Sequence, residues 1–186
     1  MEAIKKIELN KVIKIILIAI SGTLLLTISA KIKIPFYPVP MTMQTFVVLL
    51  LGITLGSKIG LLTVCLYLFE GIFGLPVFAG TPEKGIGLIY FTGPTMGYLI
   101  GFMLAAYFSG LFKYDKGIVS NFFKLMISVS FIYILGLIWL GTLIGWDKPI
   151  FKLGAQPFLW AELFKILLLL FLLPILQKSK KLLKII

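Results

Sequence analysis

Residues 121–146 read NFFKLMISVSFIYILGLIWLGTLIGW, and Lys124 is their only charged residue. A helix that spans a bilayer needs about 20 consecutive, mostly apolar residues. This stretch is longer than that, so it predicts a membrane-spanning helix with room to tilt or bend. The fold then depends on how many further segments of this kind the chain contains.

The composition of the whole chain also indicates a membrane protein. Of its 186 residues, 60% are hydrophobic and only 13% are charged, and the mean hydropathy is +1.09. A soluble domain is about 45–50% apolar, and a single core of this size cannot bury the excess. The composition therefore excludes a cytosolic enzyme, a secreted domain and a disordered tail.

Several kinds of chemistry are excluded because their residues are missing. The chain has no His and one Cys, Cys65. Zinc sites, Ser–His–Asp triads, Cys–His pairs and disulfide frameworks therefore lack their parts. The sequence also lacks a Gly-rich loop ending in Gly-Lys-Ser or Gly-Lys-Thr, so it cannot hydrolyse ATP by that route. We expect no cofactor, no metal and no enzymatic activity.

Six apolar segments predict an all-α fold, a polytopic bundle of six transmembrane helices in a single integral membrane domain, residues 1–186. The second segment is too short to cross a bilayer upright, so it extends further or lies in a protein-lined region. A signal peptide ending near Ala30 is a weaker interpretation of the first segment, because the segment is long and more apolar segments follow. The predicted spans are 12–30, 43–56, 59–73, 95–112, 121–146 and 158–176.

The distribution of lysine predicts the orientation. The chain has 18 basic residues, all Lys, and a net charge of +11. Six spans put both termini on one side, and that side carries twelve lysines against five on the other, with Lys165 inside the sixth span. Cytoplasmic loops carry the excess of Lys, so both termini are predicted to be cytoplasmic and the protein to be multi-pass in the cytoplasmic membrane. These lysines flank apolar runs, so we expect no nucleic-acid partner.

With this orientation, the polar residues of the spans fall near the external ends of their helices. The inner halves of the spans are almost purely aliphatic and aromatic. This pattern is typical of an outward-facing pocket with a closed floor, and not of a channel. The residues at the outer depth are Gln44, Glu70, Thr95, Tyr98, Trp146, Glu162 and Lys165.

Glu162 and Lys165 are the most informative of these residues. Ionisable side chains inside a span are unfavourable by about 2.5–3.5 kcal/mol each on insertion scales. Their i, i+3 spacing places both on one helix face, where they form either a simple ion pair or a ligand site. Glu70 has the simpler interpretation of a surface carboxylate that caps amides, and Gln44 suits a helix start or a site equally well.

The connections on the external side are irregular. Residues 34–41 contain three prolines and cannot be helical, and their apolar character predicts that they lie against protein. Residues 71–93 are rich in Gly and Pro, which predicts either a flexible connector or a lid over the pocket. In the first span, Ala19 and Thr23 form a small-xxx-small pair of the kind that docks another helix, for instance from a partner subunit.

Three motifs together resemble a known family. PVPMTMQT spans residues 38–45, LFEGIFGLPVFAG spans 68–80, and GPTMGYLIGF spans 93–102. In this order they resemble the BioY family, the biotin-binding substrate-capture subunits of energy-coupling factor transporters. The resemblance implies a six-helix bundle that holds the vitamin near the outer face. It also implies two kinds of partner, a transmembrane coupling subunit and a pair of cytoplasmic ATPases.

The resemblance also implies site residues. Family members carry a segment similar to Pro-Phe-Leu-Pro-Gly-Asp-x-x-Lys, and residues 157–165 read PFLWAELFK, with Glu162 in place of Asp. Lys165 would pair either with the biotin carboxylate or with the ureido oxygen. The chain has no Arg for a bidentate carboxylate clamp, so Lys84 is the candidate replacement as a point charge. The ligand-binding residues predicted are Gln44, Phe78, Gly80, Lys84, Tyr98, Glu162 and Lys165.

The expected function is therefore the capture of biotin at an outward-facing pocket and its uptake across the membrane. One alternative is a capture subunit for another small vitamin, which the changed outer loop leaves open. A second is an intramembrane lipid-modifying enzyme with Glu70 or Glu162 as base. The second alternative lacks His and a clustered pair of acids.

Overall fold

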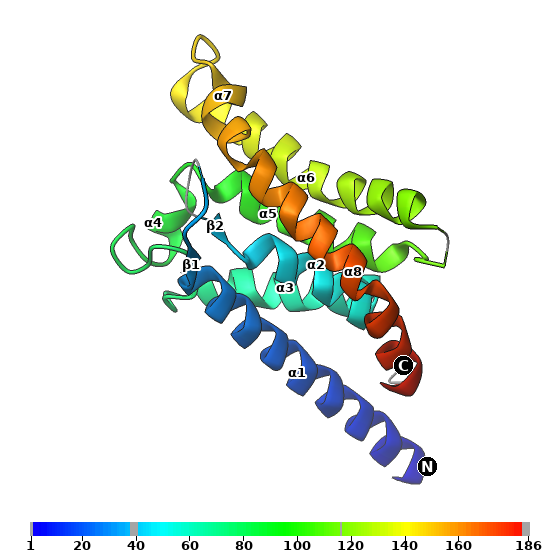
Figure 1. Ribbon diagram of the computed structural model, residues 1–186. Helices are drawn as coiled ribbons and strands as arrows, with labels where there is room; N and C mark the ends of the chain where they lie inside the picture. The colour runs from blue at the N-terminus through cyan, green and yellow to red at the C-terminus, as the bar shows by residue number, and fades with distance from the viewer. Residues whose placement is uncertain (1, 38–40, 116, 184–186) are drawn as a thin grey trace.

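The computed structural model describes residues 2–37, 41–115 and 117–183, and within these residues it is an all-α bundle (Figure 1). The prediction of an all-α fold is confirmed. The helices are α1 (Glu2–Lys31), α2 (Gln44–Leu55), α3 (Ser57–Ile72), α4 (Leu88–Phe91), α5 (Met96–Leu111), α6 (Ile118–Ile144), α7 (Ile150–Gly154) and α8 (Leu159–Leu183), with a 3-10 turn at Gln156–Phe158.

Each of the six apolar segments lies on one of the long helices α1, α2, α3, α5, α6 and α8. The largest difference is at α1, which begins at Glu2 and not near residue 12. The apolar segment begins only after the N-terminal lysines, so hydropathy alone starts the helix there. Lys, Glu and Ala are nevertheless good helix formers, and the helix includes the charged residues that precede the apolar segment. Three described stretches are long and apolar enough to cross a membrane, Val12–Lys31, Ile118–Ile144 and Ile150–Lys178.

The short helix α2 lies at the centre of the bundle. It contacts each of the other five long helices. Its side chains Val48 and Leu49 are fully buried, as expected for a helix that is apolar all round. Twelve residues reach only about 18 Å at 1.5 Å per residue. A helix enclosed by longer neighbours does not need to match the bilayer thickness on its own.

Glycines let the backbones of α2, α3 and α5 approach closely. A Cβ atom added at Gly60 of α3 would meet the Cα atom of Gly52 in α2 at 2.9 Å. A Cβ atom added at Gly110 of α5 would meet the backbone nitrogen of Ser57 at 2.4 Å. Small residues at such crossings are the usual means of tight packing between membrane helices.

Both ends of the described chain lie at one end of the bundle, and α4, α7 and the connection after α1 lie at the other (Figure 1). Termini on one side agree with an even number of crossings. The cytoplasmic placement of that side, and the six crossings themselves, stay predictions from the sequence.

The proline-rich connection contains a small antiparallel ladder that the sequence did not suggest. β1 (Lys33–Ile34) pairs with β2 (Met41–Thr42), with Lys33 opposite Thr42. Residues 38–40 of the connection lie outside the described residues. The expectation that this connection lies against protein is only partly right, because Tyr37 is 89% exposed.

The small pair on α1 faces the bundle. Ala19 and Thr23 are each 2% exposed, and the Thr23 hydroxyl donates to Glu70 Oε1 of α3 at 2.9 Å. The pair does let another helix approach closely, as its spacing predicted, and that helix is α3 of the same chain. The same contact gives Glu70 a role between helices, where the sequence had suggested the capping of amides.

Candidate ligand-binding site

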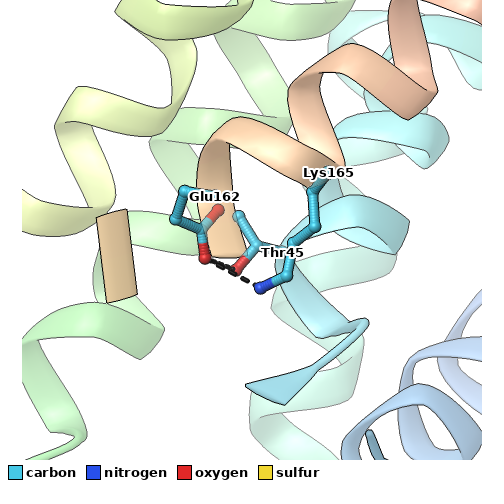
Figure 2. Close-up of polar contacts among 3 residues, drawn as sticks. All are labelled: Thr45, Glu162 and Lys165. Atoms are coloured by element: carbon cyan, nitrogen blue, oxygen red, sulfur yellow. Dashed lines mark hydrogen bonds and ion pairs between the residues drawn. The ribbon is translucent and has the colours of Figure 1, made fainter. Parts of the chain in front are cut away.

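Glu162 and Lys165 form a buried ion pair at the start of α8 (Figure 2). The Lys165 Nζ atom lies 2.8 Å from Glu162 Oε1, and the two side chains are only 5% and 8% exposed. Taking both charges out of water is unfavourable by several kcal/mol per ion unless partners compensate. Glu162 also lies in the first turn of α8, where the helix dipole favours a negative charge.

The central helix α2 supplies a third member of this cluster. The Thr45 hydroxyl donates to Glu162 Oε1 at 3.2 Å (Figure 2). Thr45 lies in the first turn of α2, so the positive end of that helix also faces the carboxylate. Oxygen Oε1 of Glu162 is therefore well satisfied.

The second carboxylate oxygen of Glu162, Oε2, lacks the two hydrogen bonds that Oε1 accepts. Oε2 is buried, and no donor lies within ordinary hydrogen-bond distance of it among the residues that the structure describes. The Tyr133 side chain of α6 lies close enough to Glu162 for an electrostatic interaction and a long, weak hydrogen bond. A buried charged oxygen without a hydrogen-bond donor is unfavourable. A ligand, an ion or a water molecule that contacts the oxygen removes this penalty.

Tyr98 is joined to this cluster through a second tyrosine. The Tyr98 and Tyr133 rings meet edge to face with centroids 6.0 Å apart. The Tyr98 hydroxyl donates to the Gly154 carbonyl of α7 at 2.8 Å. The structure therefore brings the predicted residues Tyr98, Glu162 and Lys165 into one region, bounded by α5, α6 and α8.

Gln44 begins a neighbouring network on the other side of α2. Its Nε2 atom donates to the Tyr67 hydroxyl at 2.8 Å, and Tyr67 in turn donates to the Val77 carbonyl at 2.9 Å. Phe78, only 1% exposed, meets Tyr67 edge to face with centroids 5.2 Å apart. Gln44 and Phe78 thus hold the outer loop onto the bundle.

Gly80 and Lys84 lie in a turn of that loop. The Lys84 amide donates to the Gly80 carbonyl at 2.9 Å. Gly80 has a φ angle of 77°, and a Cβ atom there would meet Lys84 Cδ at 2.8 Å. The position therefore needs glycine both for its backbone and for space. The Lys84 side chain is exposed, and the contacts of the described residues do not join it to Glu162 or Lys165.

The rest of the outer loop is fastened by polar contacts to its backbone. Lys31 at the end of α1 donates to the Thr81 carbonyl at 2.6 Å and to its hydroxyl oxygen at 2.7 Å. The Tyr90 hydroxyl donates to the Ala79 carbonyl at 2.9 Å, and burial raises the pKa of that hydroxyl. Irregular backbone at membrane depth needs such partners, and protein groups supply them here.

The sequence did not single out three residues of these networks as site residues. Thr45 directly follows Gln44 at a helix start, which was an available signal. Tyr67 and Tyr133 lie inside apolar segments, and a buried tyrosine hydroxyl needs a hydrogen-bond partner. Tyr107 also lies inside an apolar segment, so this criterion by itself does not distinguish the site tyrosines from other tyrosines.

Comparison with known proteins decides the family of this chain. The BioY family model matches residues 3–182. The chain belongs to the BioY family. A probable biotin transporter BioY of Pyrococcus horikoshii is 38% identical over 141 residues, 76% of this chain and 82% of the relative. The biotin transporter BioY of Thermotoga maritima is 38% identical over 145 residues, 77% of this chain and 84% of the relative.

A solved structure shows the same fold. It is a crystal structure of the S-component for biotin from an ECF-type ABC transporter, with a TM-score of 0.72 and 24% identity. The match covers 92% of this chain and 93% of that chain. The BioY family and these relatives are transporters and not enzymes, and the fold is that of a membrane bundle. The predicted family, fold class and membrane location are confirmed.

Proposed function

We propose that this BioY-family chain captures biotin at the buried Glu162–Lys165 cluster and mediates its uptake as the substrate-specific subunit of an energy-coupling factor transporter. The observation that carries the site is the unpartnered Glu162 Oε2 beside a buried lysine. The relatives named biotin transporters support the choice of ligand.

The charges of the cluster favour the ureido group of biotin over its carboxylate. Glu162 already neutralises Lys165, so a second carboxylate would give the buried cluster a net negative charge. A neutral ureido group has N–H donors for Glu162 Oε2 and a carbonyl oxygen that accepts from Lys165 Nζ. We therefore propose that the bicyclic end of biotin enters the cluster first. The valerate carboxylate then lies away from it, with Lys84 as a weak, exposed partner.

The remaining predicted residues act around this contact. Tyr98, half-buried beside Tyr133, covers the ring system of the ligand.

Phe78 packs against Tyr67, Tyr90 and Phe91, which supports a role in holding the outer loop over the site. Gln44 acts in the same way through Tyr67, and Gly80 allows the turn that carries Lys84.

Transport requires partners in this proposal. The chain has no ATP-binding loop of the Gly-Lys-Ser/Thr type, so a pair of cytoplasmic ATPases and a transmembrane coupling subunit drive reorientation of the loaded chain. The lysine-rich side of the bundle then faces the cytoplasm, and the pocket opens to the outside.

A capture subunit for another small vitamin is the second candidate. Glu162 stands where the family segment carries Asp, and its side chain is one methylene longer. Trp160, 68% exposed, replaces a small residue two positions earlier. Neither change removes the donor and acceptor groups of the cluster.

Equilibrium binding of radiolabelled biotin to the purified full chain in detergent separates these candidates, with riboflavin and thiamin as competitors. We expect saturable binding of about one biotin per chain, displaced only by unlabelled biotin. Displacement by another vitamin at lower concentration would support the second candidate. Folded protein that binds none of the three would contradict the capture proposal.

A further inference from the structure

Tyr133 approaches the Glu162–Lys165 cluster from α6, and the proposed function gives it no role of its own. Helices α6 and α8 pack against each other. The half-buried Tyr133 side chain lies close enough to Glu162 for a long, weak hydrogen bond. A tyrosine hydroxyl inside a protein needs a polar partner, and the Glu162 carboxylate is the partner that the structure offers it.

The Glu162 carboxylate is fixed at one of its two oxygens. Thr45 and Lys165 both donate to Oε1 (Figure 2), whereas Oε2 is buried with no donor at ordinary distance among the described residues. The last torsion of a glutamate side chain has broad energy wells. Two contacts at the same oxygen therefore leave the carboxylate free to turn, and a contact from another direction is needed to set where Oε2 points.

Tyr133 is itself held in place by Tyr98 of α5. The two rings meet edge to face with centroids 6.0 Å apart, and the Tyr98 hydroxyl donates to the Gly154 carbonyl of α7 at 2.8 Å. One helical turn beyond Tyr133, Gly136 leaves the space in which the Tyr98 ring lies, because a Cβ atom there would meet Tyr98 Cδ1 at 2.4 Å. Tyr98 is thus held between α6 and α7, and its fixed ring gives Tyr133 a defined orientation.

We propose that Tyr133 is a positioning residue of the ligand site, whose hydroxyl orients the Glu162 carboxylate so that Oε2 faces the ligand. A carboxylate accepts several hydrogen bonds, so the contact with Tyr133 leaves room for an N–H group of the ligand. An acceptor that is already oriented loses less freedom on binding than one that has to turn. This role rests on the proposed function, because it concerns the same carboxylate.

The variant Y133F tests this role, because it removes the hydroxyl and keeps the ring that packs against Tyr98. We expect Y133F to bind radiolabelled biotin about threefold to tenfold more weakly than the unmodified chain in detergent, with a similar thermal midpoint. Y107F is the matched control, since Tyr107 is a half-buried tyrosine toward the other end of α5. Its affinity should equal that of the unmodified chain.

Further comparisons separate positioning from a general disturbance of the pocket. Biotin methylated at both ureido nitrogens has no N–H donor for Glu162, so Y133F should leave its affinity unchanged. E162Q should bind biotin weakly, and adding Y133F should weaken it no further, because the carboxylate that Tyr133 orients is gone. Y98F keeps the ring and removes the anchor at Gly154. It should weaken binding less than Y133F, and Y98F/Y133F should match Y133F.

Equal affinities of Y133F and the unmodified chain would overturn the role of Tyr133. Tighter binding by Y133F would also overturn it, because the hydroxyl would then compete with the ligand for Glu162. Equal losses for biotin and its dimethylated analogue would show a disturbed pocket in place of a positioning effect. A folded, unmodified chain that binds no biotin would contradict the proposed function and this role together, whereas the other outcomes concern Tyr133 alone.

Discussion

The Thr45 hydroxyl donates a hydrogen bond to Glu162 Oε1 at 3.2 Å, although 117 residues of sequence separate the two. This contact ties the first turn of the central helix α2 to the first turn of α8. It also places the positive ends of two helices beside one carboxylate. Lys165 is the counter-ion of this carboxylate inside the bundle.

Replacement of Lys165 should weaken ligand capture. Truncation of one member of a buried, hydrogen-bonded pair is unfavourable by about 2–5 kcal/mol, so K165M should weaken biotin binding by about tenfold or more. Radioligand binding measures the effect, with K152M, an exposed lysine, as the matched control. K165M leaves the buried Glu162 carboxylate without its counter-ion. The double variant E162Q/K165M should therefore be more thermally stable than K165M. It should still fail to bind biotin. Near-normal affinity of the double variant would remove the pair from the site.

Ligand analogues should distinguish the two ends of biotin. If the ureido group contacts Glu162 and Lys165, methylation of a ureido nitrogen should weaken binding by about tenfold, because a buried acceptor loses its donor. Biotin methyl ester, which has no carboxylate charge, should bind within about threefold of biotin. Competition against radiolabelled biotin gives both values. The reverse order of potency would assign the carboxylate to the cluster.

The exposed charges of the outer loop should matter less than the buried pair. E83A/K84A should reduce biotin affinity by less than K165M does, because exposed charges interact weakly. The same binding assay compares the two variants directly. A comparable loss would show that the loop carries the charge that recognises the ligand.

Lys31 should control the opening of the outer loop. Its two contacts to Thr81 join the end of α1 to the loop, so K31M should increase amide exchange at residues 81–85 about threefold to tenfold. Hydrogen–deuterium exchange with peptide resolution measures this, and K33M, an exposed lysine of β1, is the matched control. Unchanged exchange in K31M would mean that Tyr67 and Tyr90 suffice to hold the loop.

The close crossing of α3 and α5 should not tolerate a methyl group. G110A places a Cβ atom 2.4 Å from the Ser57 nitrogen, and overpacking of this kind destabilises by about 1–3 kcal/mol. G117A is the control, because nothing lies within 4 Å of its Cβ position. Thermal unfolding in detergent should show a lower midpoint for G110A only. Equal midpoints would mean that the helices separate without penalty.

The sequence predicted the helices well because hydropathy reports directly on what a membrane bundle requires. It underestimated α1, whose first turns are charged and yet helical. It also predicted that Glu162 and Lys165 lie on one helix face, and their ion pair confirms this, while their role in ligand binding stays a prediction.

The sequence did not predict contacts between residues that are far apart along the chain. Thr45 and Tyr133 meet Glu162 only because α2 and α6 pack against α8. Ala19 and Thr23 were expected to dock another helix, but spacing identifies a small-residue face without identifying the helix that covers it, which is α3. Glu70 of α3 similarly accepts a hydrogen bond from Thr23 of α1, where the sequence had suggested neighbouring amides.

Gln44 and Thr45 are consecutive on the central helix, so their side chains point about 100° apart around its axis. One holds Tyr67 on α3 and the other holds Glu162 on α8. Both contacts begin in the same helix turn, so a shift of α2 would change the Gln44–Tyr67 and Thr45–Glu162 distances together. The helix therefore joins the outer-loop network at Tyr67 to the Glu162–Lys165 ion pair.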